Sequence, residues 1–337
     1  MSDIVSNSMI LLAGDVGGTK TVLGLFNRGT QTPITEMTFL NKEYQGLSPI
    51  IDKFLSKSNL QPNAACFAIA GPVMGNMVQM TNIKWIINGD KLCDEFALKQ
   101  VFLINDLMAT AKGAIQLPGE ELLPIQKGKE ESTGNIAVIA PGTGLGEAFL
   151  VQTERGLIPC ATEGGHSGFA PGDDVQLELL SQLQKKKTFI SVEAMCSGSA
   201  IGRLYDFFLN RTTENNGERL NFSGPDRTPE IVKAALQSLQ PGAVKCEPAM
   251  LAIQLLVDIL AGEAANLALK TLATGGVYIG GGIPPRILPF FIPQRFCSIF
   301  NRGVYKEMLS DIPINIILEP HTALLGAAAH GFSMLNK

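Results

Sequence analysis

Residues 10–26 read ILLAGDVGGTKTVLGLF, and residues 136–151 read IAVIAPGTGLGEAFLV. Each stretch has an apolar run, a glycine-rich turn with one threonine, and a second apolar run. Short apolar runs bounded by glycines are typical of β-strands, so each stretch predicts two strands joined by a tight turn. Because glycine carries no side chain, backbone N–H groups can converge in such a turn and cradle a phosphate. Two such turns in separate halves of the chain indicate a nucleotide phosphate tail held from both sides.

The surrounding pattern predicts an α/β protein. In the first hundred residues, apolar runs alternate with segments of helical periodicity. Too few residues join the two opening strands for a crossover helix, so these strands should pair antiparallel. We expect strands at residues 10–14, 21–26, 34–40, 64–70 and 101–105, and helices at residues 47–57 and 89–98.

The second half of the chain repeats the opening pattern. Residues 119–133 are polar, contain glycine and proline, and predict a passage between domains. The strand–turn–strand pattern then resumes at Ile136, and a length of 337 residues also favours two domains. We therefore expect a duplicated domain, with the ligand site in a cleft between the halves. Further along, we expect an exposed loop at residues 210–227, a buried strand ending in a glycine turn at 276–282, and a helix at 321–332.

Composition excludes several classes of function. The net charge of −4 gives no electrostatic reason to bind nucleic acid or an anionic membrane. The apolar residues 251–272 carry a polar or small stripe that includes Asp258 and Asn266, which predicts a buried helix of a soluble protein. Six scattered cysteines without metal-type spacing favour a reducing, cytoplasmic compartment, and the polar N-terminus predicts no secretory signal.

Asp15 ends the first apolar run, just before Gly17, Gly18 and Thr19. A carboxylate beside a phosphate cradle is repelled unless a divalent cation lies between them, so Asp15 predicts a magnesium-linked role. The alternative is an aspartate that stabilises its own turn. Thr19 and Thr143 can donate their hydroxyl groups to phosphate oxygens or can simply close their turns.

Asn105 and Asp106 follow the apolar run 101–104. The carboxyl end of a buried strand is where α/β folds place catalytic groups. Aspartate is also a common helix N-cap, and the residues alone leave both interpretations open.

Residues 163–166 read EGGH, an acid and a histidine separated by two glycines. The glycines allow the backbone to approach a ligand and both side chains to point into a cleft, although a structural loop is the alternative. Glu193 follows the apolar residues 189–192 and by itself fits a surface carboxylate. Carboxylates, an asparagine and a histidine without metal-ligand spacing suit a ligand with many hydroxyl groups.

Taken together, the motifs closely resemble those of bacterial-type glucokinases, in the superfamily of actin-like ATPases and hexokinases. The resemblance extends over essentially the whole chain, from about residue 9 to residue 333. The motifs that carry it are Gly14-Asp15-Val16-Gly17-Gly18-Thr19, Ala70-Gly71-Pro72, Thr81-Asn82-x-x-Trp85, Asn105-Asp106, Pro141-Gly142-Thr143-Gly144-Leu145-Gly146, Glu163-Gly164-Gly165-His166 and Gly280-Gly281-Gly282-Ile283.

The resemblance implies two ribonuclease-H-like α/β domains with a cleft between them. The small domain would comprise residues 1–116 plus about 307–337, and the large domain residues 117–306. It also implies ATP and Mg²⁺ as cofactors, glucose as the substrate, and a cytoplasmic homodimer with no nucleic-acid or membrane partner.

Residue roles follow from the same resemblance. Asp106 would be the general base that takes the proton of the 6-hydroxyl of glucose, and Asp15 would hold Mg²⁺ through water. The residues expected to bind the sugar are Asn105, Asp106, Glu163, His166 and Glu193. The residues expected at the ATP phosphates and adenosine are Gly14, Asp15, Gly17, Gly18, Thr19, Lys20, Gly142, Thr143, Gly144, Gly280, Gly281 and Gly282.

Other functions fit the same scaffold. The acceptor could be mannose, glucosamine or an N-acetylhexosamine, or the chain could be a non-catalytic sugar sensor or an ATPase with a protein partner. The presence of Asp106 and the absence of a helix-turn-helix extension argue against a sensor, and the loop at residues 163–166 favours a small polar acceptor. The sequence lacks the cysteine-rich zinc motif of the repressor–kinase branch, which excludes that branch and structural zinc. It also has Ala194 after Glu193, where relatives often have arginine.

Overall fold

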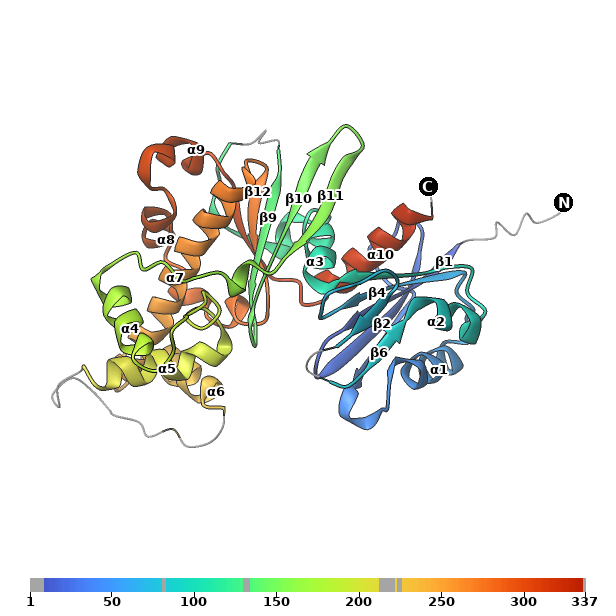
Figure 1. Cartoon of the computed structure of the whole chain (residues 1–337), viewed down its shortest axis with the longest axis horizontal. Helices are drawn as coiled ribbons and strands as arrows, with labels where there is room; N and C mark the ends of the chain where they lie inside the picture. The colour runs from blue at the N-terminus through green and yellow to red at the C-terminus, as the bar shows by residue number, and fades with distance from the viewer. Residues whose placement is uncertain (1–8, 81–82, 130–133, 212–221, 223–225, 336–337) are drawn as a thin grey trace. The chain divides into compact units, whose positions relative to one another are not determined.

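The computed structural model describes residues 9–80, 83–129, 134–211, 222 and 226–335, which form two compact units (Figure 1). Unit 1 consists of the described residues of Met1–Pro118, Pro159–Ala161 and His321–Lys337. Unit 2 consists of those of Gly119–Ile158 and Thr162–Pro320. The chain therefore returns to unit 1 with its last helix.

Unit 1 contains a mixed five-stranded sheet. Its strands, in spatial order, are β3 (Thr35–Leu40), β2 (Lys20–Asn27), β1 (Ile10–Val16), β4 (Ala64–Ile69) and β7 (Val101–Asn105). The pairs β1–β2 and β2–β3 are antiparallel, whereas β1–β4 and β4–β7 are parallel. The predicted antiparallel pairing of the two opening strands is therefore confirmed.

Helices cover both faces of this sheet. The helices are α1 (Leu47–Ser58), α2 (Gly89–Phe96), α3 (Asp106–Ala114) and α10 (Thr322–Met334), and a small hairpin joins β5 (Met77–Gln79) to β6 (Ile86–Asn88). On β1, Leu12 shares a buried cluster with Phe54 of α1, whereas Leu11 shares another with Ala109 of α3 and Leu324 of α10. Alternate residues of a strand point to opposite faces, so β1 lies at the centre of both cores.

Unit 2 repeats this arrangement with one additional strand. Its strands, in spatial order, are β11 (Gly156–Thr162), β10 (Leu145–Thr153), β9 (Ile136–Pro141), β12 (Gly276–Ile279), β13 (Ile314–Ile317) and β8 (Leu122–Gln126). The pair β9–β10 is antiparallel, and β9–β12 and β12–β13 are parallel. The first five strands have the same order as those of unit 1, which confirms the predicted duplication of an α/β domain.

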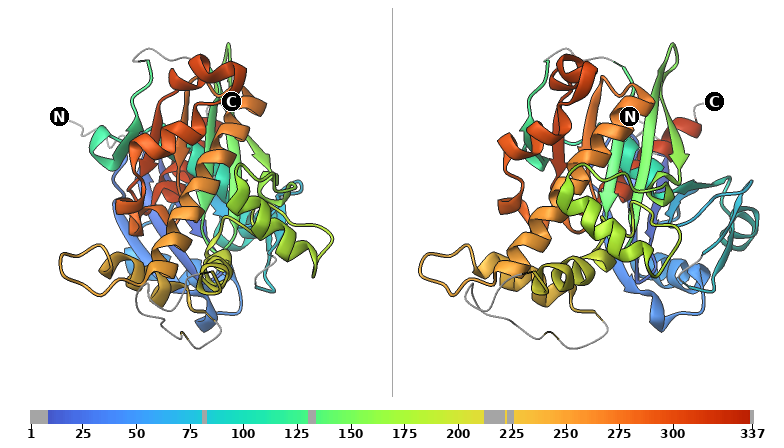
Figure 2. Two further views of the ribbon diagram at one scale, coloured as in Figure 1. Left: turned by 90° about the vertical axis from the view of Figure 1, so that its left-hand side faces the viewer. Right: turned by 60° about the vertical axis from the view of Figure 1, so that its left-hand side comes forward.

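The long helix α7 (Glu247–Thr271) lies at the centre of unit 2 and packs against β9 and α5 (Gly198–Leu209) (Figure 2). Of the stretch of α7 that is apolar enough to cross a membrane, 72% is buried inside the protein, as predicted for a core helix. The remaining helices are α4 (Asp174–Gln184), α6 (Thr228–Gln237), α8 (Pro293–Phe300) and α9 (Lys306–Ser310). Short 3₁₀ helices lie at Asn41–Glu43, Gly119–Glu121, Gly164–His166, Pro284–Arg286, Leu288–Phe290 and Gly303–Tyr305.

Some segments differ from their sequence-based expectation. Residues 119–133 were expected to be a passage between domains, but they include β8, which pairs with β13 at the edge of the sheet of unit 2. The strand β13, which lies within the range 307–337 expected for the small domain, belongs to the sheet of unit 2, and the exact domain boundaries stay a prediction. Most of the expected loop at residues 210–227 lies outside the described residues.

Candidate active site

Three strand ends of unit 1 meet at one edge of its sheet. In the parallel register, Val16 of β1 lies opposite Ile69 of β4, and Ile69 lies opposite Asn105 of β7. The glycine turn after β1, Gly71 after β4 and Asp106 after β7 are therefore brought to this edge. Ligands of α/β sheets bind at the carboxyl ends of the strands.

The first glycine turn joins β1 directly to β2. The backbone N–H of Gly17 donates to the carbonyl of Lys20 at 3.0 Å, so the turn is tight, and Thr19 and Lys20 are exposed. Gly14 has a packing role, because a Cβ atom there would lie 2.5 Å from the Phe67 ring. Asn41, which no sequence motif marks, lies just after β3 and is hydrogen-bonded to this turn.

Asp15 precedes this turn and is half-buried. Burial raises the pKa of Asp15 from 3.8 to about 6, against the opposing effect of the positive charges of Lys20 and His321. His321, at the start of α10, has its Nδ1 atom 3.1 Å from Oε1 of Glu36 on β3. Burial destabilises the charged form of the Asp15 carboxylate, and a nearby cation stabilises that form. The Asp15 side chain therefore fits a hydrated Mg²⁺ ion. Within the described part of the chain, no group of three His, Cys, Asp or Glu residues could hold a metal ion.

Asn105 caps helix α3. Its Oδ1 accepts from the N–H groups of Leu107 and Met108 at 3.0 and 3.2 Å. Its Nδ2 donates to Oδ1 of Asp106 at 3.0 Å and to the carbonyl of Gly71 at 3.3 Å. The N-cap role that the sequence left open for Asp106 therefore belongs to Asn105, and Asp106 is the first residue of the helix.

The second glycine turn joins β9 to β10 in unit 2. Within it, the N–H of Gly142 donates to the carbonyl of Gly144 at 2.8 Å. The carbonyl of Gly142 in turn accepts from the N–H of Gly198, at the start of α5, at 2.7 Å. The glycines after β12 lie beside this turn, because the N–H of Gly280 donates to the carbonyl of Ile139 on β9. Gly281 has a φ of +87° and packs on the carbonyl of Pro141, where a Cβ atom would lie 2.4 Å from the oxygen.

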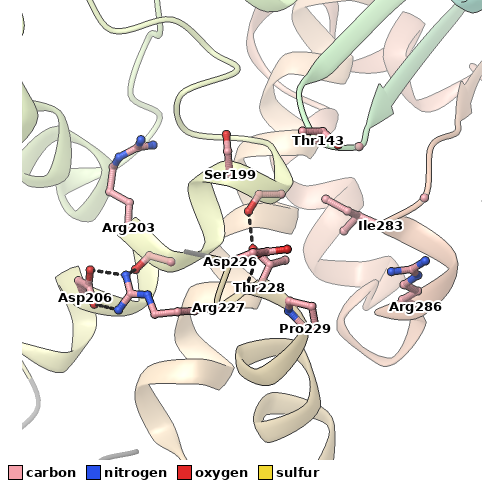
Figure 3. Close-up of a pocket in the computed structure, with 14 residues that line it drawn as sticks. Thr143, Ser199, Arg203, Asp206, Asp226, Arg227, Thr228, Pro229, Ile283 and Arg286 are labelled. Atoms are coloured by element: carbon pink, nitrogen blue, oxygen red, sulfur yellow. Dashed lines mark hydrogen bonds and ion pairs between the residues drawn. The ribbon is translucent and has the colours of Figure 1, made fainter. Parts of the chain in front are cut away.

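A pocket of about 850 Å³ opens next to this turn (Figure 3). The N-termini of α5 and α6 border the pocket with Ser199 and Thr228, and the Thr228 hydroxyl donates to the carbonyl of Gly198 at 2.8 Å. N–H groups at the start of a helix favour anions. The lining residues are Gly142, Thr143, Gly198, Ser199, Gly202, Arg203, Asp206, Asp226, Arg227, Thr228, Pro229, Gly282, Ile283 and Arg286.

Three arginines and two aspartates line this pocket. Arg227 pairs with both carboxylate oxygens of Asp206, at 2.8 and 2.7 Å, which fixes the guanidinium and raises the pKa of Arg227. Arg203 and Arg286 lie on opposite sides of the pocket (Figure 3). The lining therefore carries one more positive than negative charge and suits an anionic ligand. Of the lining residues, only Gly142, Thr143 and Gly282 were predicted from the sequence, since nothing local marks the arginines.

The two glycines of the 163–166 loop lie in close contact with β10, Gly164 with the end of a side chain and Gly165 with backbone. A Cβ atom on Gly164 would lie 1.9 Å from Oε2 of Glu147, and one on Gly165 would lie 2.1 Å from the carbonyl of Leu145. The loop therefore packs tightly on β10, directly after the second glycine turn. Glu163 and His166 flank these two glycines.

Glu193 lies beside this loop. Its backbone N–H donates to the carbonyl of Gly165 at 2.8 Å, and its Oε1 lies 4.0 Å from Nδ1 of His166. Its Oε2 accepts from the N–H of Leu145 at 2.9 Å and fills the space above Gly144. Glu193, which by itself fitted a surface carboxylate, thus joins the loop to the glycine turn.

Glu147, which the sequence analysis did not single out, lies beneath the loop. Its side chain is 3% exposed, and its Oε1 atom has no hydrogen-bond partner among the described residues. Burial and the charge of Glu263 raise the pKa of Glu147 to about 7, against the effect of Lys270. A buried carboxyl group in this setting is stable mainly in its protonated form.

Each unit therefore brings together its own share of the predicted residues. Unit 1 gathers Asp15, the first glycine turn, Asn105 and Asp106, and unit 2 gathers the second turn, the loop, Glu193 and the pocket. In the Thr81-Asn82-x-x-Trp85 motif, Trp85 is buried, whereas Thr81 and Asn82 lie outside the described residues.

Comparison with known proteins identifies the family. A family model described as "Glucokinase" matches residues 12–333. The chain is 37% identical to a glucokinase of a Nostoc species over 336 residues, and 35% identical to that of Trichormus variabilis over 342 residues. In each case the match covers 95% of this chain and 98% of the relative.

Solved structures agree with this result. A glucokinase from an Antarctic psychrotroph has a TM-score of 0.83 and 29% identity, with 96% of this chain and 99% of that chain covered. A glucokinase from Balamuthia mandrillaris in complex with glucose has the same fold, with a TM-score of 0.73, 22% identity, and 97% of this chain and 94% of that chain covered. A kinase of the repressor–kinase branch from Streptomyces griseus is a more distant neighbour in fold, with a TM-score of 0.63, 19% identity, and 96% of this chain and 99% of that chain covered. The chain therefore belongs to the glucokinase family, whose members are kinases with the actin-like ATPase fold.

Proposed function

We propose that this chain transfers the γ-phosphoryl group of ATP to the 6-hydroxyl of glucose, giving glucose 6-phosphate and ADP. The observation that carries the proposal is the position of Asp106, at the carboxyl end of β7 and at the same sheet edge as the first glycine turn. Asn105 is the N-cap of α3, and Oδ1 of Asp106 also accepts from the Leu107 N–H at 2.9 Å, which holds the carboxylate at the start of the helix.

Asp106 is proposed as the general base. The neutral 6-hydroxyl of glucose must lose its proton as the bond to phosphorus forms, and a carboxylate within hydrogen-bond reach can accept it. The hydrogen bond from Nδ2 of Asn105 to Oδ1 of Asp106 holds the carboxylate in one orientation. Positioning and charge neutralisation provide most of the rate enhancement in phosphoryl transfer, so this orientation matters.

ATP is proposed to bind at the two glycine turns and in the 850 Å³ pocket. The positive balance of the pocket and the N-termini of α5 and α6 support an anionic nucleotide there. The proposed phosphate contacts come from Gly17, Gly18, Thr19 and Lys20 in unit 1 and from Gly142, Thr143 and Gly144 in unit 2. Gly280, Gly281 and Gly282 are proposed to lie near adenosine.

Asp15 is the residue proposed to hold Mg²⁺, through water. The half-buried carboxylate with its raised pKa supports this role. When bound, Mg²⁺ neutralises charge on the phosphate oxygens.

The sugar hydroxyls are proposed to bind Asn105, Glu163, His166 and Glu193. The hydrogen bond from the Leu145 N–H to Glu193 supports a single orientation of this carboxylate. A rigid set of acceptors and donors discriminates strongly between sugars, because a wrong sugar leaves polar groups unpaired.

The first experiment measures ADP release from ATP and Mg²⁺ in a coupled assay, with and without glucose. We expect strong stimulation by glucose and weaker stimulation by mannose, glucosamine and N-acetylglucosamine. If another hexose gives the higher kcat/KM, the acceptor assignment is wrong. Turnover that is independent of every sugar would instead favour an ATPase with a protein partner.

The resemblance also implies a cytoplasmic homodimer, and this stays a prediction. Sedimentation velocity should give a mass twice that of the 36.0 kDa chain.

A further inference from the structure

Asn41 makes three hydrogen bonds that hold the first glycine turn. Its backbone N–H donates to the carbonyl of Thr19 at 2.9 Å. Its side-chain Nδ2 donates to the carbonyl of Gly17 at 2.8 Å, and its Oδ1 accepts from the hydroxyl of Thr21 at 2.8 Å. Asn41 thus contacts both sides of the turn, although it lies more than twenty residues further along the chain.

The orientation of the Asn41 amide is fixed by its partners. The carbonyl of Gly17 can only accept a hydrogen bond, so the amide nitrogen must face it. The oxygen then faces the hydroxyl of Thr21, which donates. Asn41 is 3% exposed and Thr21 is fully buried, so the hydrogen bond between their side chains is shielded from water. Buried hydrogen bonds of this kind hold a backbone in one geometry, and leaving one partner unpaired is costly.

We propose that Asn41 is a positioning residue for the phosphoryl donor: its buried amide fixes the first glycine turn in the conformation that binds the nucleotide phosphates. This inference rests on the proposed assignment of that turn to the phosphates. Asn41 acts through Gly17 and Thr19. Both polar atoms of the side chain are engaged, by Gly17 and Thr21, so its proposed effect on the nucleotide is exerted through the turn.

The main test compares Asn41→Ala with a matched variant at the other end of β1. Asn63 bonds to Ile10 in a similar way: its Oδ1 accepts from the Ile10 N–H, and its own N–H donates to the Ile10 carbonyl, both at 2.8 Å. Asn63→Ala should reduce the stability of the protein by about as much as Asn41→Ala does, but it should leave the phosphate turn intact. We expect Asn41→Ala to raise the KM for ATP about threefold to tenfold, the effect of one or two lost hydrogen bonds. The KM for glucose should change less than about twofold, and Asn63→Ala should change neither constant.

A second variant tests the direction of the amide. Asn41→Asp is nearly isosteric but places a carboxylate oxygen against the carbonyl of Gly17. Because this position is buried, the new carboxyl group should take up a proton readily, and the protonated form can donate to Gly17 again. The KM for ATP of this variant, relative to the unaltered chain, should therefore fall as the pH is lowered from about 8 to about 6. A residue that served only general stability would give a constant ratio.

Gly18→Val provides the reference for the turn itself, since it adds a branched side chain to the proposed phosphate cradle. A raised KM for ATP in both Gly18→Val and Asn41→Ala, but not in Asn63→Ala, supports the inference. If Gly18→Val raises the KM for ATP while Asn41→Ala, like Asn63→Ala, leaves this KM unchanged, the inference is wrong and the proposed function stands. If neither turn variant alters ATP binding, the assignment of the turn to phosphate fails, and the inference fails with it. Should Asn41→Ala not fold, Thr21→Val removes the hydroxyl that orients the amide and makes the same comparison.

Discussion

Asp106 and Asn105 are neighbours in the sequence but have different roles at the start of α3. The Asn105 side chain satisfies two N–H groups of the first helical turn and holds Oδ1 of Asp106. A substitution of Asp106 should therefore have a different kinetic effect from a substitution of Asn105.

For Asp106→Asn, we expect kcat to fall on the order of 10² or more, because the amide cannot accept the hydroxyl proton. Glucose should still bind, because the side chain keeps its shape and its hydrogen-bonding capacity. Stopped-flow or coupled assays give kcat, and a binding titration gives the Kd for glucose. Near-normal turnover of this variant would remove Asp106 from the mechanism.

Glu147 gives a second prediction at the scale of one residue. Its folded-state pKa is raised from 4.5 to about 7, mainly by burial and then by the charge of Glu263. The folded protein therefore keeps this proton to a higher pH than the unfolded chain. The contribution of this proton to the free energy of unfolding is roughly 3 kcal/mol. It is fully present below about pH 4.5 and is lost as the pH rises through about 7.

Glu147→Gln removes this ionisation. The melting temperature of the variant relative to the unaltered protein should rise between about pH 5 and about pH 8. Glu154→Gln is the control, because Glu154 is exposed on the same β10–β11 hairpin and should show no such trend. Parallel pH profiles for Glu147→Gln and the unaltered protein would contradict the assignment.

At the scale of elements, α3 and α10 pack at unusually short range. A Cβ atom on Gly326 of α10 would lie 1.7 Å from the carbonyl of Ala109 on α3, and one on Gly113 of α3 would lie 2.1 Å from the carbonyl of Thr322. Each of the two helices thus contributes one glycine that allows close approach of the other. The backbone atoms in these contacts cannot move away as a flexible side chain could.

Gly326→Ala should therefore destabilise the protein by about 1–3 kcal/mol or more, although alanine favours a helix. Gly262→Ala is the matched control, because Gly262 lies in α7 and its Cβ position is 3.6 Å from the nearest atom. This control should be neutral or should stabilise by up to about 1 kcal/mol. Thermal unfolding followed by circular dichroism compares the two variants, and Trp85, the only tryptophan and a buried residue of unit 1, follows unit 1 separately. Equal stability of the two variants would contradict the close packing.

At the scale of the whole molecule, unit 1 is assembled from both ends of the chain. Leu324 and Ala327 of α10 are buried with Leu11 and Ala13 of β1. The strand β1 also contributes to the core on the other face of the sheet. We therefore infer that unit 1 cannot fold stably without the last helix.

A chain that ends after Pro320 should lose the native fluorescence of Trp85 and all glucose-dependent turnover. Its circular dichroism should keep the helical signal of unit 2, which contains α4 to α9. A chain that ends after Leu335 is the control and should be fully active, since α10 ends at Met334. Native tryptophan emission from the shorter chain would show that α10 is dispensable for unit 1.

The sequence by itself determined the two strand–turn–strand units, the α/β class, and the identity of α7 as a core helix. These features are local, because apolar periodicity and glycine turns express the preferences of neighbouring residues. The motifs around Asp15, Asp106 and the 163–166 loop could be recognised for the same reason. The structure then brought Glu193 to that loop through its backbone bond to Gly165.

Only the tertiary structure decided which distant residues support these motifs. Asn41 reaches Gly17, Glu193 reaches Leu145, and Glu147 packs on Gly164, each through contacts between segments far apart in the chain. The arginines of the pocket were likewise missed, because a single polar residue has no distinctive local pattern. The edge strand β8 was missed because it is a short apolar stretch, interrupted by Pro124, within a polar segment. Their roles arise from burial and hydrogen bonding in the folded protein, where the energy of an unpaired polar group depends on its surroundings rather than on its neighbours in sequence.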